Sequence, residues 1–226
     1  MSAAPASISV IVPVHNGARF ISDALLSVKS QTRPPEEIIV VDDGSIDDSA
    51  AIVRSQHPDV ILITQQRGRA AAARNTGALH AHGEALAFLD HDDLWPPERN
   101  AVLLEAWKAH PEAEVVYGSI RVLAEADARK DSRIRNADRA HIPYLLGSLL
   151  IRRSCWLALG GMESVRDVAD DVDFHLRLRE FGAKILSVDS PTRIYRMHAT
   201  NGANATVHTS RILLSALRAA VERRRA

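Results

Sequence analysis

The sequence predicts an α/β fold in which helices flank a mostly parallel central sheet. Short β-branched runs alternate with longer amphipathic stretches through the first half of the chain, and turn residues mark each change. The strand candidates are almost uniformly apolar between their ends, as parallel strands are when helices cover both faces of a sheet. With 46% hydrophobic and 25% charged residues, the 226-residue chain has the composition of a folded protein with a substantial core.

Each of the early strands leads into a helix. Apolar runs predict strands at residues 8–14, 38–41, 60–64 and 84–90. Amphipathic spacing predicts the helices between them at about 20–28, 47–56 and 69–82. This order is the repeating strand–helix–strand unit of a parallel sheet.

The later elements are less regular. A helix over 97–109, with prolines near its start, and a strand over 114–120 come first. The charge-dense segment 121–141 shows no clear period, which indicates a surface excursion. Beyond it we expect an apolar stretch at 144–153, a short helix ending at Gly160 and Gly161, a helix from about Asp170, strands at 184–188 and 192–197, and a terminal helix.

Charge balance and the lack of targeting signals narrow the class of protein. Lys+Arg and Asp+Glu number 28 each, so the overall charge does not predict a nucleic-acid partner. The single cysteine, Cys155, can form no internal disulfide, suits a reducing compartment and is expected as a small buried side chain. No stretch approaches the roughly 18 apolar residues of a membrane span, and the first residues do not resemble a signal peptide, so we expect a cytoplasmic location.

Polar clusters follow the strand candidates at the points where these end. They are the sequences HNG at 15–17, DDGS at 42–45 and DHDD at 90–93, together with Arg69 in the helix that follows the third strand. The carboxyl ends of parallel strands meet at one edge of a sheet, where ligands bind. Each cluster taken alone also suits a solvated turn or helix cap, but together they predict one shared ligand site.

The three carboxylates of Asp90, Asp92 and Asp93 lie within four positions. Such neighbours repel one another and raise each other's proton affinity unless a cation relieves them. Oxygen ligands favour hard divalent ions such as Mg2+ or Mn2+, which commonly join carboxylates to substrate phosphates. If the strand continues through this stretch, His91 points away from Asp90 and Asp92, and a structural role is expected for it.

Several blocks of the sequence resemble family 2 of the inverting glycosyltransferases. These blocks read ISVIVPVHNG, EIIVVDDGS, ARNTGALHAHGEALAFLDHDD and DDVDFHLRLREFG, and the similarity runs from Ile8 to about His198. The resemblance implies a single GT-A domain over residues 1–226. In this domain, residues 8–120 form a Rossmann-like half that binds the nucleotide sugar, residues 121–206 form a smaller acceptor-binding and catalytic half, and residues 207–226 form a C-terminal helix.

The resemblance assigns the donor site residue by residue. Pro13, His15 and Asp42 match the loops that hold the nucleobase and ribose, although Pro13 also suits the edge of a strand. Arg69 matches a basic residue near the base or the phosphates, although a solvated helix start explains it nearly as well. Asp90 opens the Asp-x-Asp element and matches a contact to the nucleotide sugar.

A metal is implied beside these donor residues. In similar enzymes one of the carboxylates corresponding to Asp92 and Asp93 binds a divalent ion and the other reaches the ribose. Arg196 and His198 match a late basic element that approaches the diphosphate or its metal, and Arg193 is a weaker match. His198 also suits a purely structural role.

Asp171 matches the catalytic base of the family, within an acidic pair that is usually Glu-Asp and is here Asp170-Asp171. An acceptor hydroxyl is a poor nucleophile, so a carboxylate must take its proton as the new bond forms. A helix N-terminus favours the ionised form that such a base needs. Asp173 is a nearby competitor for the assignment, and a plain helix cap is the alternative.

The resemblance implies a metal-dependent enzyme that moves a sugar from a nucleoside-diphosphate sugar to the hydroxyl of a saccharide, lipid-linked or other acceptor, with Mn2+ or Mg2+ as cofactor. A catalytically degenerate relative that serves as a binding or scaffold subunit is the alternative. A sugar nucleotidyltransferase fits less well, since HNGARF is not a Gly-rich basic phosphate loop. The C-terminal helix ends in three arginines, which complement the helix dipole or could rest on an anionic membrane.

Overall fold

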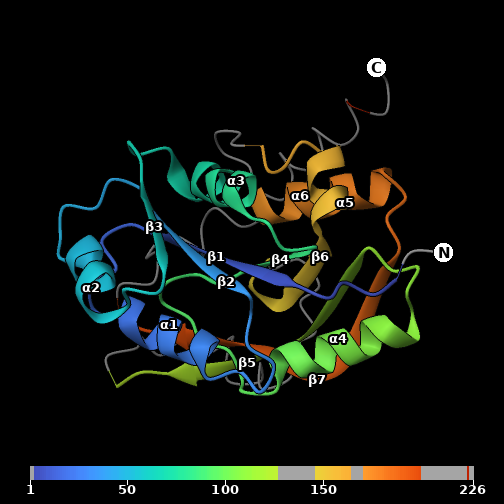
Figure 1. Cartoon of the computed structure of the whole chain (residues 1–226), viewed down its shortest axis with the longest axis horizontal. Coiled ribbons are helices and arrows are strands. Elements are labelled where there is room, and N and C mark those ends of the chain that lie inside the picture. Colours follow the sequence, from blue (N-terminus) through green and yellow to red (C-terminus); the bar gives the residue numbers. More distant parts are fainter. Residues whose placement is uncertain (1–2, 127–145, 164–169, 200–222, 224–226) are drawn as a thin grey trace.

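The computed structural model describes residues 3–126, 146–163 and 170–199, together with Arg223. Within these residues, seven strands form one sheet in the order β3-β2-β1-β4-β6-β5-β7 (Figure 1). β6 is antiparallel to β4 and β5, whereas the other neighbouring pairs are parallel, which confirms the predicted mostly parallel sheet. The strands are β1 Ile8–Val14, β2 Glu37–Asp42, β3 Ile61–Thr64, β4 Ala85–Phe88, β5 Val115–Ala124, β6 Leu149–Arg152 and β7 Ile185–Met197.

Helices cover both faces of this sheet. They are α1 Ile21–Lys29, α2 Ser49–Gln56, α3 Arg69–His80, α4 Arg99–Ala109, α5 Arg153–Ala158 and α6 Asp170–Glu180, with a 3-10 turn at Leu146–Ser148. Figure 1 shows α3, α5 and α6 on one face and α1 and α4 on the other. None of the helices in the described part of the chain combines the length and apolar character that crossing a membrane requires.

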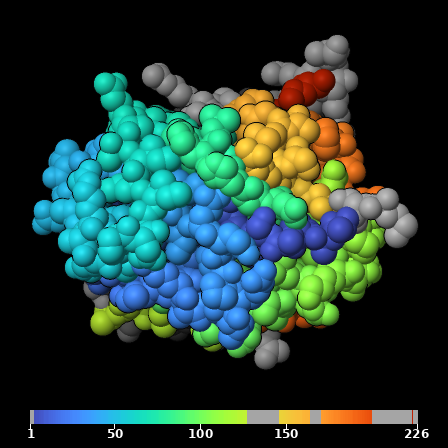
Figure 2. Space-filling model, viewed as in Figure 1, coloured from blue at the N-terminus to red at the C-terminus, as the bar shows by residue number. Residues whose placement is uncertain are grey.

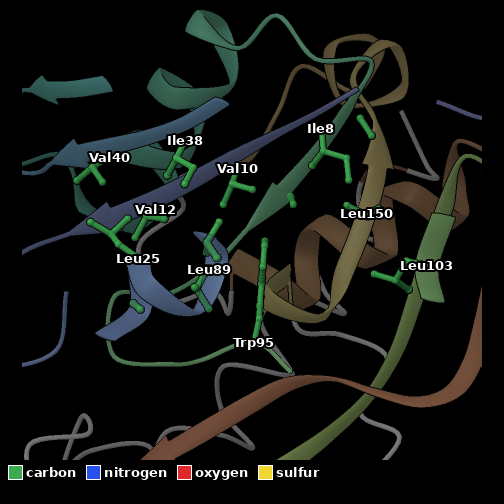
Figure 3. Packing of buried hydrophobic residues seen from close by; sticks show 14 of the residues in the cluster. Ile8, Val10, Val12, Leu25, Ile38, Val40, Leu89, Trp95, Leu103 and Leu150 are labelled. Atoms are coloured by element: carbon green, nitrogen blue, oxygen red, sulfur yellow. The ribbon is translucent and has the colours of Figure 1, made fainter. Parts of the chain in front are cut away.

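The core has two parts, one on each face of the sheet. Val10 and Val12 of β1 belong to the cluster that includes Leu25 of α1 (Figure 3). Ile11, between them, belongs to the opposite cluster with Ala78 of α3. Successive side chains of a strand point to opposite faces, and both faces are covered, so β1 is buried along its whole length. This is why its sequence is apolar apart from Ser9, whose hydroxyl donates to Glu37.

The N-terminal residues run along the surface before β1 begins. In the space-filling view they lie, in dark blue, between the yellow α5 region and the green α4 region (Figure 2). Arg152 of β6 donates to the carbonyl of Ala3 at 2.9 Å, and the Ala6 N–H donates to Glu84 at 2.7 Å. These contacts tie the segment to the edge of the sheet where β1 and β4 start.

β5 and β7 are longer than the sequence predicts. The runs expected as two strands, 184–188 and 192–197, form one strand, with an irregular register where it passes Ser119. β5 continues through residues 121–124, which pair with β7, although this stretch was expected to be a surface excursion. Cross-strand pairing overrides a charge-rich sequence here. The rest of that segment from residue 127 lies outside the described residues, as does the predicted C-terminal helix apart from Arg223.

Candidate functional site

A cavity of about 280 Å³ lies at the edge of the sheet where β1, β2 and β4 end. Four of the residues that the sequence assigned to the nucleotide sugar line it, namely Pro13, His15, Asp90 and Asp92. The other lining residues are Val14, Asp43, Ala70, His91, Arg193 and Tyr195. The polar clusters that follow separate strands therefore converge, as the parallel topology predicted.

The loops after β1 and β2 hold each other in place at this cavity. The Asp43 N–H donates to the carbonyl of Val14 at 2.8 Å, and Nδ1 of His15 lies 3.0 Å from the carbonyl of Asp43. Because a carbonyl can only accept, Nδ1 carries the proton in this contact and Nε2 is left as an acceptor. Gly17 lets the loop pass His91, since a side chain at this position would overlap the imidazole ring.

Asp42 and Asp43 have different surroundings. Oδ1 of Asp42 accepts from the N–H of Ser45 at 3.0 Å, which is the turn contact that the sequence offered as an alternative role. Oδ1 of Asp43 accepts from Gln65 and from the N–H of Gly68, both at 2.7 Å. Asp43, rather than Asp42, lines the cavity and fixes the loop that leads into α3.

Arg69 is exposed and has a positive φ of 70°, a conformation that residues other than glycine rarely adopt. Such backbone strain concentrates at binding and active sites. Arg69 itself is not among the cavity-lining residues, but the next residue, Ala70, is. The first turn of α3 thus lies at the cavity.

The Asp-rich stretch is a turn and not a continuation of β4. β4 ends at Phe88, and the Asp93 N–H donates to the carbonyl of Asp90 at 3.0 Å. Strand alternation therefore does not apply, and His91 lines the same cavity as Asp90 and Asp92. The expectation that His91 points away from them is wrong, because it assumed that the strand continues to Asp92, whereas the chain turns there.

β7 is fixed beside this turn. The N–H of Leu94 donates to the carbonyl of Ile194 at 3.1 Å, and the N–H of Ile194 donates back to Leu94 at 2.8 Å. This antiparallel pair brings Arg193 and Arg196 against the acidic turn, although a hundred or so positions separate them in the chain.

Carboxylates and arginines alternate through the site in one connected chain. Arg74 of α3 donates from Nη1 to Asp171 at 3.4 Å and from Nη2 to Asp90 at 2.6 Å. Arg193 donates from Nη2 to Asp90 at 3.0 Å and from Nε to Asp93 at 2.5 Å. Two buried arginines therefore join three acidic residues, two from the turn after β4 and one from α6.

The arginines change the protonation behaviour of these carboxyls. Burial acts to raise the pKa of Asp90, but Arg74 and Arg193 outweigh it and hold the pKa well below the usual range. For Asp171, burial has the larger effect and raises the pKa, against a lowering contribution from Arg74. Burial likewise raises the pKa of Asp170 to about 6.

Asp92 and Asp93, the two candidate metal ligands, occupy opposite environments. The side chain of Asp93 is fully buried, and its two oxygens accept from Nε of Arg193 and from the N–H of Arg196 at 2.9 Å. The side chain of Asp92 is 25% exposed, lines the cavity and has Oδ2 3.4 Å from Nε2 of His198. His198 in turn lies against the ring of Phe20, with ring centroids 4.2 Å apart.

The donor chemistry of this pair suits a divalent ion that also binds phosphate. A carboxylate and an imidazole are acceptable ligands for Mn2+, and such ions commonly keep few protein ligands and take further oxygens from phosphates. No group of three or more potential metal-ligating side chains occurs among the described residues, so this part of the chain offers no cage made of protein alone.

The match to a family model decides what kind of protein this is. The model of glycosyl transferase family 2 matches residues 9–171, which is most of the chain. The chain belongs to the family 2 glycosyltransferases. The matched region contains every cavity-lining residue except those of β7, and it ends at Asp171.

Curated relatives of this family 2 chain carry glycosyltransferase names. A putative glycosyltransferase of Bacillus subtilis, EpsE, is 29% identical over 187 residues, covering 77% of this chain and 67% of the relative. An uncharacterized glycosyltransferase of a Nostoc strain is 39% identical over 114 residues, covering 49% of this chain and 35% of the relative. The chain thus spans about a third to two thirds of the length of these two relatives.

Solved glycosyltransferase structures share the GT-A fold of this chain. A mannosyltransferase from Pyrobaculum calidifontis, solved with GDP-Man and Mn2+, superposes with a TM-score of 0.72 at 26% identity, covering 96% of this chain and 64% of that one. S. aureus TarS in complex with UDP-GlcNAc gives a TM-score of 0.68 at 22% identity, covering 85% and 59%. The predicted fold class is therefore confirmed.

Within this family 2 chain, sequence reasoning missed Arg74. The signal was available: Arg74 lies on the same side of α3 as the buried Ala71, Gly77 and Ala78, at helical spacing. A charged residue in an apolar stripe must find a buried partner of opposite charge, since an unpaired buried charge is too costly. The sequence alone could not show that the partners are Asp90 and Asp171.

Proposed function

We propose that this chain is a metal-dependent, inverting glycosyltransferase that uses a nucleoside-diphosphate sugar. The observation that carries the proposal is the different state of the carboxylates around the cavity. Arginines pair with Asp90 and Asp93, and the nearly buried Asp43 accepts hydrogen bonds from Gln65 and Gly68, so Asp92, beside His198, is the carboxylate we assign to a cation at the cavity. The complex of the Pyrobaculum mannosyltransferase with GDP-Man and Mn2+ supports such a donor and ion.

We assign the metal to Asp92 and His198 and not to Asp93. Both oxygens of Asp93 already accept hydrogen bonds inside the protein. When bound, Mn2+ or Mg2+ would stabilise the negative charge that develops on the departing nucleoside diphosphate. Pro13 and His15, with the turn that Asp42 and Asp43 form, would hold the nucleoside.

Asp171 is the proposed catalytic base. The acceptor hydroxyl gives its proton to Asp171 while its oxygen bonds to the anomeric carbon, and the bond from that carbon to the diphosphate oxygen breaks in the same step. One displacement inverts the anomeric centre, and no covalent bond to the protein forms. The carboxyl lies in the first turn of α6 and receives a hydrogen bond from the N–H of Leu146 at 3.4 Å.

The proposal is tested by binding and by transfer. Calorimetry with UDP- and GDP-sugars should detect a donor that binds with Mn2+ and much more weakly with EDTA. Asp92→Asn should remove the dependence on Mn2+. Asp171→Asn should leave donor affinity within a few-fold of wild type and reduce transfer by a factor of about 100 or more, the usual contribution of a general base.

The control is Asp59→Asn, which removes an exposed aspartate that pairs with Lys29 away from the cavity, and it should change neither measurement. The anomeric configuration of the product, read by NMR, tests inversion. Retained transfer in Asp171→Asn would remove that residue from the role. Absence of any Mn2+-dependent donor binding would favour the scaffold alternative.

A further inference from the structure

Arg74 contacts both a carboxylate assigned to the donor and the proposed catalytic base. It is a residue of α3 with 6% of its surface exposed, and its two terminal nitrogens reach different carboxylates. Nη2 donates to Asp90 at 2.6 Å, on the donor side, and Nη1 donates to Asp171 at 3.4 Å, at the start of α6. A planar guanidinium can make both contacts at once in a fixed geometry, which a single ammonium group cannot.

Neighbouring contacts fix α3 against the segment before α6. Asn75 donates to the carbonyl of Met162 at 2.7 Å and accepts from the Met162 N–H at 2.9 Å. Nη1 of Arg74 also lies 3.9 Å from the sulfur of Met162. These contacts fix the position of α3 beside Met162, so the backbone that carries Arg74 is fixed relative to the segment before α6.

We infer that Arg74 is a positioning residue that holds Asp171 in a fixed relation to the donor-side Asp90 and balances the negative charge of both. This inference rests on the proposed role of Asp171. It goes beyond that role because it states which cation opposes the effects of burial and neighbouring acids on this carboxyl. Arg74 does not contact the reacting atoms.

The charged groups that face Asp171 come from three other segments. Arg74 of α3 and Arg193 of β7 lower its pKa, whereas Asp90 and burial raise it, burial being the largest effect. Asp170, its neighbour in α6, is a further like charge. The N–H of Leu146 also favours the ionised form. Removal of Arg74 should therefore raise the pKa of Asp171 further.

NMR titration of the aspartate carboxyl carbons tests this directly. The signal of Asp171 is assigned by its loss in Asp171→Asn and followed against pH in the absence of donor and acceptor. Arg74→Met should shift its midpoint to higher pH, and Arg74→Lys should shift it less. Arg54→Met, which removes an exposed arginine of α2, should leave it unchanged. An unchanged midpoint in Arg74→Met would overturn the inference.

A second variant covers the case in which Arg74→Met does not fold. Asp90→Asn removes a negative charge near Asp171 and leaves Asp171 as the remaining anionic partner of Arg74 in this contact. The titration midpoint of Asp171 should therefore move to lower pH. A midpoint that stays in place or rises would contradict the inference. Neither titration requires turnover, so a failure of the proposed transfer reaction remains distinguishable from a failure of the Arg74 contact.

Once a donor is identified, turnover supplies an independent readout. Arg74→Met should lower kcat at neutral pH by about tenfold or more and move the acidic limb of the pH profile upward, with activity partly recovered at higher pH. A merely structural role for Arg74 would lower activity equally at all pH values, and that result would count against the inference.

Discussion

Buried arginine side chains determine how the acidic residues of this site can be used. Arg193 contacts Asp90 and Asp93, and Arg74 contacts Asp90 and Asp171; both arginines are nearly fully buried, whereas the carboxyls of Asp90 and Asp171 are partly exposed. Ion pairs in such positions add little net stability, because desolvation offsets the attraction, but removal of one partner is costly. The pairs therefore serve mainly to fix geometry and charge.

Arg193→Met should destabilise the protein, because it removes one partner of a buried ion pair. It leaves Asp93 fully buried without its cation. Burial already raises the pKa of Asp93 to about 7, so the carboxyl must take up a proton or remain a lone buried charge, and the free energy of unfolding at pH 7 should fall by up to about 3–5 kcal/mol. Urea denaturation measures the change. The double variant Arg193→Met with Asp93→Leu should lose less free energy of unfolding than Arg193→Met alone, because it has no buried carboxylate without a cation. Arg121→Met, an exposed arginine of β5, is the control, and an equal loss there would contradict the argument.

Asp171→Asn should increase stability while it removes activity. The pKa of Asp171 is raised in the folded protein, chiefly by burial, so stability from this group is present at low pH and is lost as pH rises through the folded pKa. The neutral side chain should raise Tm at pH 7, because it removes this unfavourable charge while Arg74 keeps Asp90 as a partner.

The pH dependence of this gain provides its check. The gain should shrink as pH falls towards 3.8, the ordinary pKa of aspartate. Asp59→Asn should show the opposite sign at pH 7, because a hydrogen bond from Lys29 lowers the pKa of Asp59. A gain in Asp171→Asn that is independent of pH would show that charge is not its origin.

At the scale of elements, close packing of α3 on β1 places the arginine contacts. Gly77 faces Ile11, and a methyl group at Gly77 would overlap Cγ2 of that side chain. The absence of a side chain lets the helix approach the sheet. β7 places the second arginine: the bridge between its Ile194 and Leu94 holds the strand, and with it Arg193, beside the acidic turn.

Gly77→Ala tests the approach of α3. Overpacking typically costs about 1–3 kcal/mol, whereas alanine in place of glycine in a helix gains about 1 kcal/mol, so we expect a net loss of up to about 2 kcal/mol. Thermal and urea unfolding measure it. Ile11→Ala alone should also destabilise, but the two changes together should cost less than their sum, because the methyl group then has room. Simple additivity would argue against the contact.

At the scale of the whole molecule, the parallel topology gathers the candidate site at one edge. The loops after β1, β2 and β4 meet there, β7 adds Arg193 to the cavity, and Arg74 of α3 contacts Asp90. A site assembled from so many segments exists only in the folded chain. Ligands that bind it should therefore stabilise the global fold by mass action.

Mn2+ together with UDP or GDP should raise Tm in a concentration-dependent way. At about 100 times the dissociation constant the expected stabilisation is about 2.7 kcal/mol, which corresponds to a Tm shift of about 5–11 °C in a chain of this size. Differential scanning fluorimetry measures the shift, and EDTA should remove most of it. Asp92→Asn should abolish the contribution of Mn2+, and an undiminished shift in that variant would exclude Asp92 as a ligand.

Local pattern was sufficient for much of the fold. The apolar run of β1, the polar residues that end β1, β2 and β4, and the amphipathic helices between them were all predicted, because period and turn chemistry are properties of neighbouring residues. The convergence of these ends at one cavity followed from the parallel arrangement. Family resemblance supplied the proposed roles of Asp92 and Asp171.

Only the tertiary structure decided the partners of the charges. Arg193 and Asp90 lie 103 positions apart, and Arg74 and Asp171 lie 97 apart, so no local pattern could pair them. The extension of β5 and the continuity of β7 likewise depend on strand pairing between distant segments. The sequence determines which residues carry charge at the sheet edge. Packing determines which of those charges are neutralised and which remain available, because desolvation and pairing are set by the surroundings of the folded side chain.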